Sequence, residues 1–322
     1  MADTTKIQWA DATLNPWGGC TKVSSGCAKC YAEHATPVRA MGIGWGKGVP
    51  RHRFTGFEVN ALRLDRKAAK IGRPLRVFPS LCDWLDAEVH AEWLAGFLDV
   101  VLRTPHLTWI LLTKRPELWR ERLAEACAFA GAFREDEKWA AVGAWCDRWL
   151  QGEAPANVWF VFSAEDQRTF DLRVPAALAV PAVIRGVSLE PLLGEIDVRD
   201  WLGAVLPSIH GQSNFPIDGL QWVITGGESA APGDTPRRCE VFWIWAIVAA
   251  CARAGVACFV KQLGGFCTTG NANAHDWPDE TVFTEGGTAF AEARVRLSHP
   301  KGGDPVEWPP ELHVRQWPEV KP

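Results

Sequence analysis

Six short apolar runs, each followed by polar residues, constrain the fold of this chain more than any other feature. Each run has a continuous core of about four to seven apolar residues, not an alternation of apolar and polar ones. Continuous runs are typical of strands that are buried on both faces of a parallel sheet. We therefore expect strands within residues 76–83, 107–117, 157–166, 182–191, 220–229 and 256–265, and a first strand near 12–17.

Helical patterns separate these runs. Apolar residues recur at spacings of three and four in 87–103 and 237–255, and Gly255 is a helix stop signal. Strands that alternate with helices predict βα units and a parallel sheet. Six or seven such units predict an α/β fold, namely a partial (β/α) barrel, with an open doubly wound sheet as the alternative.

The domain organisation follows from where this alternation stops. We expect one barrel domain over residues 1–267, with an enlarged helical crossover at 118–156. Residues 268–322 contain loop-rich stretches and a hairpin-like pattern at about 281–297. We expect them to form a C-terminal extension packed on the barrel.

Polar residues gather where the predicted strands end. Parallel α/β folds build their ligand sites at the carboxyl ends of the strands, so we expect these side chains to line one mouth. A polar strand end that merely caps a helix is the alternative at any single position. The residues include Ser163, Glu165, Glu190, Gly226, Gly227, Glu228 and Lys261, together with Asp83, Thr113, Lys114 and Arg115.

Three closely spaced cysteines follow the predicted first strand. Cys20, Cys27 and Cys30 have the spacing C-x6-C-x2-C, and no fourth cysteine is near them in sequence. Structural zinc sites normally have four protein ligands, whereas a [4Fe–4S] cluster held by three cysteines leaves one iron open. The motif thus favours an iron–sulfur cluster. His34 keeps a Cys3His zinc site as the alternative.

Composition narrows the classes further. The chain has no apolar run of 18 residues and no signal-peptide core, so we expect no membrane span and a cytoplasmic protein with reduced thiols. The net charge of −4 argues against wholesale coating of nucleic acid. Residues 39–76 nevertheless carry ten Lys or Arg against two acids, a local excess that can guide a polyanion or can simply be a solvated helix face.

Several stretches of the chain resemble a known family. IQWADATLNPWGGCTKVSSGCAKCYAE, LLTKRPE, VSLEPLLGEID, WVITGGES, GVACFVKQLGG and DPVEWPPELHVRQWP extend from Ile7 to Pro318. In these stretches the chain resembles the phage-associated three-Cys-motif proteins, a family of unassigned function. That family in turn resembles radical S-adenosylmethionine (SAM) enzymes, most nearly the spore photoproduct lyase branch, in which a tyrosine follows the third cysteine as Tyr31 does here.

The resemblance implies a partial (β/α) barrel, a [4Fe–4S] cluster and SAM as cofactors. Two features depart from the radical SAM pattern. The first cysteine gap is six residues, where most radical SAM enzymes have three, and Lys29 stands where an aromatic residue often packs on SAM.

Roles for the site residues follow from their chemistry and from this resemblance. The metal ligands are Cys20, Cys27 and Cys30. We expect cofactor contacts from Tyr31, Thr113, Lys114, Ser163, Glu165, Gly226 and Gly227, and catalytic roles for Glu190, Glu228 and Lys261. The alternatives are a helix cap for Ser163, a strand-to-loop turn for the glycines and a surface lysine for Lys261.

The resulting hypothesis is a radical SAM enzyme that generates a 5′-deoxyadenosyl radical. We expect it to act on a DNA base or nucleotide, in modification or repair, and to need an electron donor. Arg51, Arg53 and Lys67 are the candidate nucleic-acid contacts. The rival hypotheses are a zinc-stabilised nucleic-acid-binding protein without catalysis and an iron–sulfur protein that transfers electrons or serves a partner.

Overall fold

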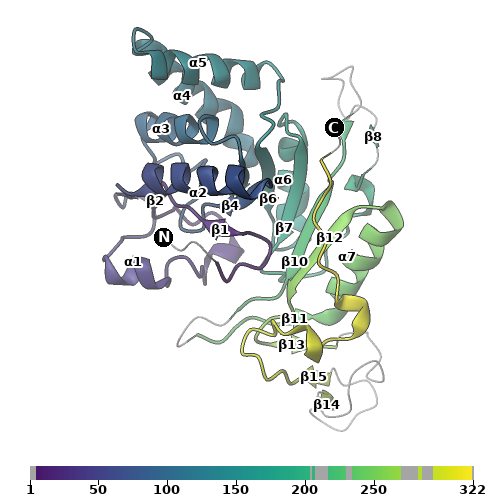
Figure 1. Ribbon diagram of the computed structural model, residues 1–322. Coiled ribbons are helices and arrows are strands. Elements are labelled where there is room, and N and C mark those ends of the chain that lie inside the picture. Colours follow the sequence, from purple (N-terminus) through teal and green to yellow (C-terminus); the bar gives the residue numbers. More distant parts are fainter. Residues whose placement is uncertain are drawn as a thin grey trace. The chain divides into compact units, whose positions relative to one another are not determined.

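A seven-stranded parallel sheet is the centre of the fold in the computed structural model (Figure 1), which describes residues 5–203, 205–206, 217–229, 234–269, 282–284 and 293–320. The strand order is β1-β4-β5-β6-β7-β10-β12, with β1 and β12 at the two edges. The strands are β1 (Ala12–Thr13), β4 (Leu75–Phe78), β5 (Leu107–Thr113), β6 (Val158–Ser163), β7 (Ile184–Leu189), β10 (Trp222–Gly226) and β12 (Ala257–Gln262).

This sheet confirms the predicted fold class. Six of the seven strands lie within the predicted runs, and β4 begins one residue before its run, at Leu75. The strand order does not close on itself, as in a partial barrel. Every residue of β6 and of β10 is buried. Their continuous apolar character thus reflects cover on both faces.

The chain divides into two compact units. Unit 1 comprises residues 1–23, 32–162 and 175–185, and it contains β1, β4, β5 and most of β6. Its helices α3, α4 and α5 pack on one another, and the stacked rings of Trp84 and Trp149, with centroids 6.0 Å apart, lie in its core. Its other elements are β2 (Trp17–Gly18), α1 (Thr36–Ala40), β3 (His52–Arg53), α2 (Phe57–Ile71), α3 (Ala91–Leu102), η2 (Pro116–Leu118), α4 (Trp119–Ala132) and α5 (Glu137–Leu150).

Unit 2 comprises residues 24–31, 163–174 and 186–322. It contains most of β7, all of β10 and β12, and a four-stranded sheet of order β11-β13-β15-β14. Helix α7 ends at Gly255, which has a φ of 65°, so the predicted stop is confirmed. The elements are η1 (Ser25–Cys27), α6 (Gln167–Leu178, continuing into unit 1), η3 (Arg199–Trp201), β8 (Val205–Leu206), β9 (Ile217–Asp218), β11 (Cys239–Glu240), α7 (Val241–Ala254), β13 (Cys267–Thr268), β14 (Val282–Thr284), β15 (Ala293–Val295), η6 (Pro305–Glu307) and η7 (Pro310–Leu312).

The C-terminal segment lies along β12. The Val260 N–H donates to the Val314 carbonyl at 2.8 Å, and the Gln316 N–H donates to the Cys258 carbonyl at 2.8 Å. The expected hairpin near 281–297 corresponds to the antiparallel pair β14 and β15, and residues 285–292 between them lie outside the described residues. The division into a barrel domain and a C-terminal extension stays a prediction.

A membrane-spanning helix is absent from the part of the chain that the structure describes. None of its helices is both long enough and apolar enough to cross a bilayer.

Candidate metal centre

The cysteine loop, residues 19–35, connects β2 to α1 and contributes residues to both units. Cys20 belongs to unit 1, whereas Cys27 and Cys30 belong to unit 2. None of the ten cysteines forms a disulfide. Among the described residues, no group of three or more His, Cys, Asp or Glu side chains is gathered as a metal site. The contacts of Cys20 within unit 1 and those of Cys27 within unit 2 are therefore described separately.

Cys20 lies beside a buried ion pair at the carboxyl end of β5. The Nη1 and Nη2 atoms of Arg115 are each 3.6 Å from the Cys20 Sγ, and Arg115 Nη1 is 2.6 Å from Asp83 Oδ2. Arg115 also donates to the Thr21 carbonyl. Because Arg115 is 4% exposed, its N–H groups are held at the sulfur without competition from bulk water.

The predicted residues Thr113 and Lys114 belong to the same network. The Thr113 hydroxyl donates to Asp83 Oδ1 at 2.8 Å, and the Lys114 backbone N–H donates to Asp83 Oδ2 at 2.9 Å. The Asp83 carboxylate thus accepts hydrogen bonds from three consecutive residues at the end of β5. The Thr113 hydroxyl is one of these donors.

The protonation of Cys20 depends on the same groups. Burial, together with the Asp83 carboxylate, raises the pKa of the Cys20 thiol to about 12, against the opposing effect of the Arg115 guanidinium. A metal ion at this sulfur would have to displace the thiol proton, since the thiolate is the ligand. Arg115 would then stabilise the negative sulfur through its N–H groups.

Cys82 is a second thiol near Cys20. The Gly19 N–H donates to the Leu81 carbonyl at 3.1 Å, which brings the two cysteine-bearing segments side by side. Burial raises the pKa of the Cys82 thiol, and its electrostatic interaction with Cys20 raises it further. The signal that could have found it is its place at the end of the run 76–83.

Arg51 has a structural role in unit 1. Its Nε donates to Asp86 Oδ2 at 2.8 Å, and its Nη2 donates to the Thr21 hydroxyl at 2.6 Å. The residue is 8% exposed, so its charge is not presented at the surface where a nucleic-acid contact was expected. The side chains of Arg53 and Lys67 are exposed.

Cys27 lies buried in the turn η1 of unit 2. The Cys27 N–H donates to the Ser24 carbonyl at 2.9 Å, and the Ser24 Oγ is 3.8 Å from the Cys27 Sγ. The preceding Gly26 N–H donates to Glu165 Oε1 at 3.1 Å. A Cβ on Gly26 would lie 3.0 Å from the Glu165 carboxyl carbon, so a larger residue here would press on that carboxyl group.

Glu165 follows β6 and is fully buried. Its Oε2 is 3.0 Å from Arg173 Nη1, which also donates to the Ser163 carbonyl at 2.8 Å. The Ser163 hydroxyl donates to the Glu190 carbonyl at 3.3 Å. The structure thus places Ser163 and Glu165 at a strand end as expected, where both make contacts within the protein.

Glu228, just beyond β10, is bound by Arg237. Arg237 Nε donates to Glu228 Oε2 at 3.0 Å, and Arg237 Nη2 is 2.5 Å from Glu228 Oε1. Burial raises the pKa of Glu228, but the hydrogen bonds from Arg237 outweigh burial, so the pKa lies below its ordinary value. Glu228 is therefore a carboxylate at neutral pH. Arg237 also donates to the Ser25 carbonyl at 2.8 Å. Ser25 belongs to η1, which is called the cysteine turn below.

Glu190 and Lys261 meet at the ends of β7 and β12. The Lys261 Nζ is 2.8 Å from Glu190 Oε1, and the Ser188 hydroxyl donates to Glu190 Oε2 at 3.2 Å. Gly226 lies against this pair, since a Cβ there would be 3.2 Å from Glu190 Oε1. Gly227 has no room either, because its Cβ would be 2.2 Å from the Leu263 carbonyl oxygen. Both glycines allow close packing of neighbouring segments within unit 2.

Tyr31 and His34 complete the predicted set. The Tyr31 side chain is about half exposed, and His34 is half-buried. Tyr31 belongs to unit 2 and His34 to unit 1. Their contribution to a metal site stays a prediction.

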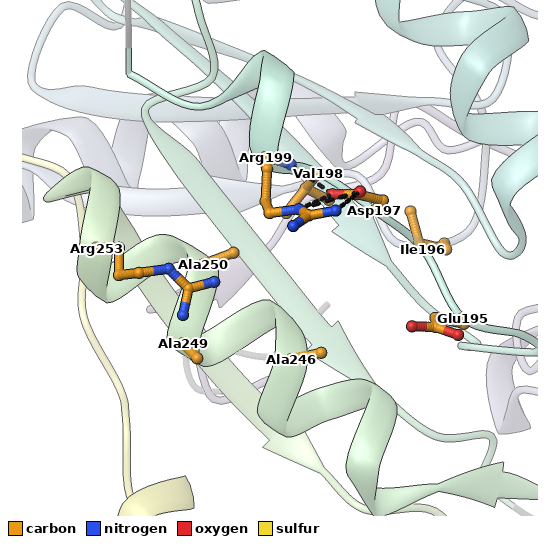
Figure 2. A pocket seen from close by; sticks show the side chains of 9 residues that line it. All are labelled: Glu195, Ile196, Asp197, Val198, Arg199, Ala246, Ala249, Ala250 and Arg253. Atoms are coloured by element: carbon orange, nitrogen blue, oxygen red, sulfur yellow. Dashed lines mark hydrogen bonds and ion pairs between the residues drawn. The ribbon is translucent and has the colours of Figure 1, made fainter.

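A pocket in unit 2 involves none of the predicted site residues. It has a volume of about 270 Å³ and lies between residues 195–199 and helix α7 (Figure 2). Ala246, Ala249 and Ala250 line one side, and the ion pair of Arg199 with Asp197 lies on the other.

The surroundings of Cys20 have the chemistry of a thiolate metal ligand. Soft sulfur ligands suit zinc, Cu(I) and iron–sulfur clusters. N–H groups aimed at a ligand sulfur, as those of Arg115 are at Cys20, are typical outer contacts of such sites.

Comparison with known proteins places the chain in a family. The family model described as "Protein of unknown function (DUF5131)" matches residues 4–299. The chain belongs to the DUF5131 family. No curated protein matches it.

Two solved structures resemble this DUF5131 protein distantly. They are "Spore photoproduct lyase complexed with dinucleoside spore photoproduct" at a TM-score of 0.38 and a point mutant of spore photoproduct lyase at 0.39. In both cases the sequence identity is 10%, and the match covers 92% of this chain and 72% of the other. The TM-scores are too low for this likeness to indicate a function.

Proposed function

We propose that this DUF5131 protein is an iron–sulfur enzyme of the radical SAM type. One observation carries the proposal: the cysteine loop is hydrogen-bonded, at Cys20 and again at Gly26, to side chains that directly follow parallel strands. Arg115, after β5, reaches the Cys20 sulfur, and Glu165, after β6, binds the Gly26 N–H beside Cys27. Since ligand sites of parallel α/β folds lie at these strand ends, a metal on the loop would lie where such folds perform chemistry.

In this proposal Cys20, Cys27 and Cys30 hold a [4Fe–4S] cluster and leave one iron for the amino and carboxylate groups of SAM. When bound, the cluster and SAM supply a hydrogen-abstracting 5′-deoxyadenosyl radical, with electrons from an external donor. The protein contributes position and charge. Arg115 stabilises the Cys20 thiolate, and Lys261 offers an ammonium group to a carboxylate or phosphate while Glu190 holds it in place.

Incubation of the anaerobically reconstituted protein with SAM and dithionite tests this function. The expected product is 5′-deoxyadenosine, absent when Cys27→Ala is treated in the same way. A protein that keeps its cluster but yields no 5′-deoxyadenosine, with or without DNA, supports the electron-transfer hypothesis instead. A protein that binds one zinc and no sulfide supports the Cys3His hypothesis with His34.

We further propose a nucleic-acid substrate, on the basis of the solvent face of α2. Its exposed cations recur at spacings of three and four, whereas Phe57, Ala61, Leu64 and Ala68 bury the opposite face. The two acids of this helix are engaged elsewhere, because Glu58 pairs with Arg103 and Asp65 with His106. A single-sign stripe on an acidic chain favours a polyanion such as a phosphate backbone. The stripe consists of Arg63, Arg66, Lys67 and Lys70.

A further inference from the structure

One peptide group of the cysteine turn is held from both sides by oppositely charged side chains. The Ser25 carbonyl accepts a hydrogen bond from Arg237 Nη1 at 2.8 Å, and the Gly26 N–H donates to Glu165 Oε1 at 3.1 Å. These two groups belong to the same planar peptide unit. Its orientation is therefore fixed at both edges by charge-assisted hydrogen bonds.

Each of the two side chains is itself held by an ion pair. Glu165 is fully buried and pairs with Arg173, which is 4% exposed. Arg237 pairs through two of its nitrogens with Glu228, which is 6% exposed. Because a buried carboxylate is stable only when it is paired, each pair holds together the side chains that contact the peptide between them.

The clamped peptide determines where Cys27 lies. Cys27 is the next residue after Gly26, and the Ala28 N–H donates back to the Ser25 carbonyl at 3.1 Å. Gly26 permits the contact, since a Cβ there would press on the Glu165 carboxyl group. Lys29 adds a further tie through its bond to the Thr235 carbonyl.

We infer that Glu165 and Arg237 are positioning residues, which fix the turn that presents Cys27 before any metal is bound. Arg173 and Glu228 support them through the two ion pairs. This inference adds positioning residues to the proposed cluster site. Only its expected effect on iron retention rests on the proposed function. In this inference the carboxylates of Glu165 and Glu228 act through the turn η1. The cofactor contact expected of Glu165 and the catalytic role expected of Glu228 stay predictions.

Hydrogen exchange of the metal-free protein tests the clamp without a cofactor. Peptides that cover residues 24–31 should exchange faster in Arg237→Ala and Glu165→Gln than in wild type, and by a larger factor than the peptides of any other region. Gly26→Ala keeps both charges and should have the same effect, because its Cβ displaces the carboxylate. Arg199→Ala, which removes an exposed arginine–carboxylate pair elsewhere in unit 2, is the matched control and should leave 24–31 unchanged. Unchanged exchange of 24–31 in all three clamp variants would overturn the inference.

Iron retention gives the second readout. Residues that orient metal ligands typically contribute about 10- to 100-fold to metal affinity, so chelator-driven iron loss should be faster in Arg237→Ala by about that factor. Arg237→Lys, which keeps one donor toward the Ser25 carbonyl, should restore part of the difference. Iron loss at the wild-type rate in Arg237→Ala would contradict the clamp. A wild-type protein that takes up no cluster would contradict the proposed function alone, and the exchange experiment would still decide on the clamp.

Discussion

The guanidinium of Arg115 approaches the sulfur of Cys20 to 3.6 Å through two of its nitrogens while it forms a 2.6 Å ion pair with Asp83. The buried guanidinium thus pairs with the Asp83 carboxylate and at the same time contacts the sulfur of a candidate metal ligand. Both halves of this arrangement can be tested separately, since the ion pair affects the metal-free protein and the sulfur contact affects the loaded one.

Replacing Arg115 by Met should destabilise the metal-free protein by about 3–5 kcal/mol. The reason is that the buried Asp83 carboxylate would lose its partner. The double variant Asp83→Asn/Arg115→Met should recover a large part of this loss, because no unpaired charge remains. Urea unfolding of the three proteins measures the effect, and a double variant as unstable as Arg115→Met would contradict the ion-pair explanation.

The pH dependence of stability should report the pair of Glu228 and Arg237. The folded pKa of Glu228 lies below its ordinary value of 4.5, so its stabilisation is fully present above about pH 4.5 and is lost as the pH falls through the folded pKa. Glu228→Gln should therefore lower the melting temperature at pH 7 and converge with wild type in acid. Melting curves between pH 3 and pH 7 test this, and a constant difference would show that the ionised pair is not responsible.

The cation stripe on α2 should govern binding to nucleic acid. Lys67→Glu/Lys70→Glu should weaken binding to a single-stranded DNA and reduce the slope of log affinity against log salt by about 1 to 2, because fewer counterions are released. Arg134→Glu, at an exposed site of unit 1 outside the stripe, is the control for charge reversal. Fluorescence anisotropy at several salt concentrations gives both values. Equal slopes in wild type and the double variant would remove α2 from the interface.

Cys82 should not replace a cluster ligand, although its segment is hydrogen-bonded next to that of Cys20. We expect Cys82→Ala to retain the iron and sulfide of wild type, whereas Cys20→Ala should lose most of both. The iron and sulfide contents of the two variants and of wild type, measured after reconstitution in parallel, test this prediction. A Cys82→Ala protein that loses its cluster would make Cys82 a ligand and the site a four-cysteine one.

The sequence predicted the sheet because the information was local. Each buried strand is a continuous apolar run, and Gly255 ends α7 as its backbone preference requires. The contacts of the site were not predictable in this way. Gly26 and Glu165 are 139 residues apart in sequence, and Arg237 and Ser25 are 212 apart, so only the folded chain brings them together. Arg51 shows the same limit, since its charge suggested a surface contact until its bond to Asp86 placed it inside unit 1.

The iron and acid-labile sulfide content of the anaerobically reconstituted protein tests the central claim most directly. We predict about four irons and four sulfides per chain in wild type, and a loss of most of both in each of Cys20→Ala, Cys27→Ala and Cys30→Ala. A wild-type protein with one zinc and no sulfide, or a cluster that survives all three substitutions, would contradict the account.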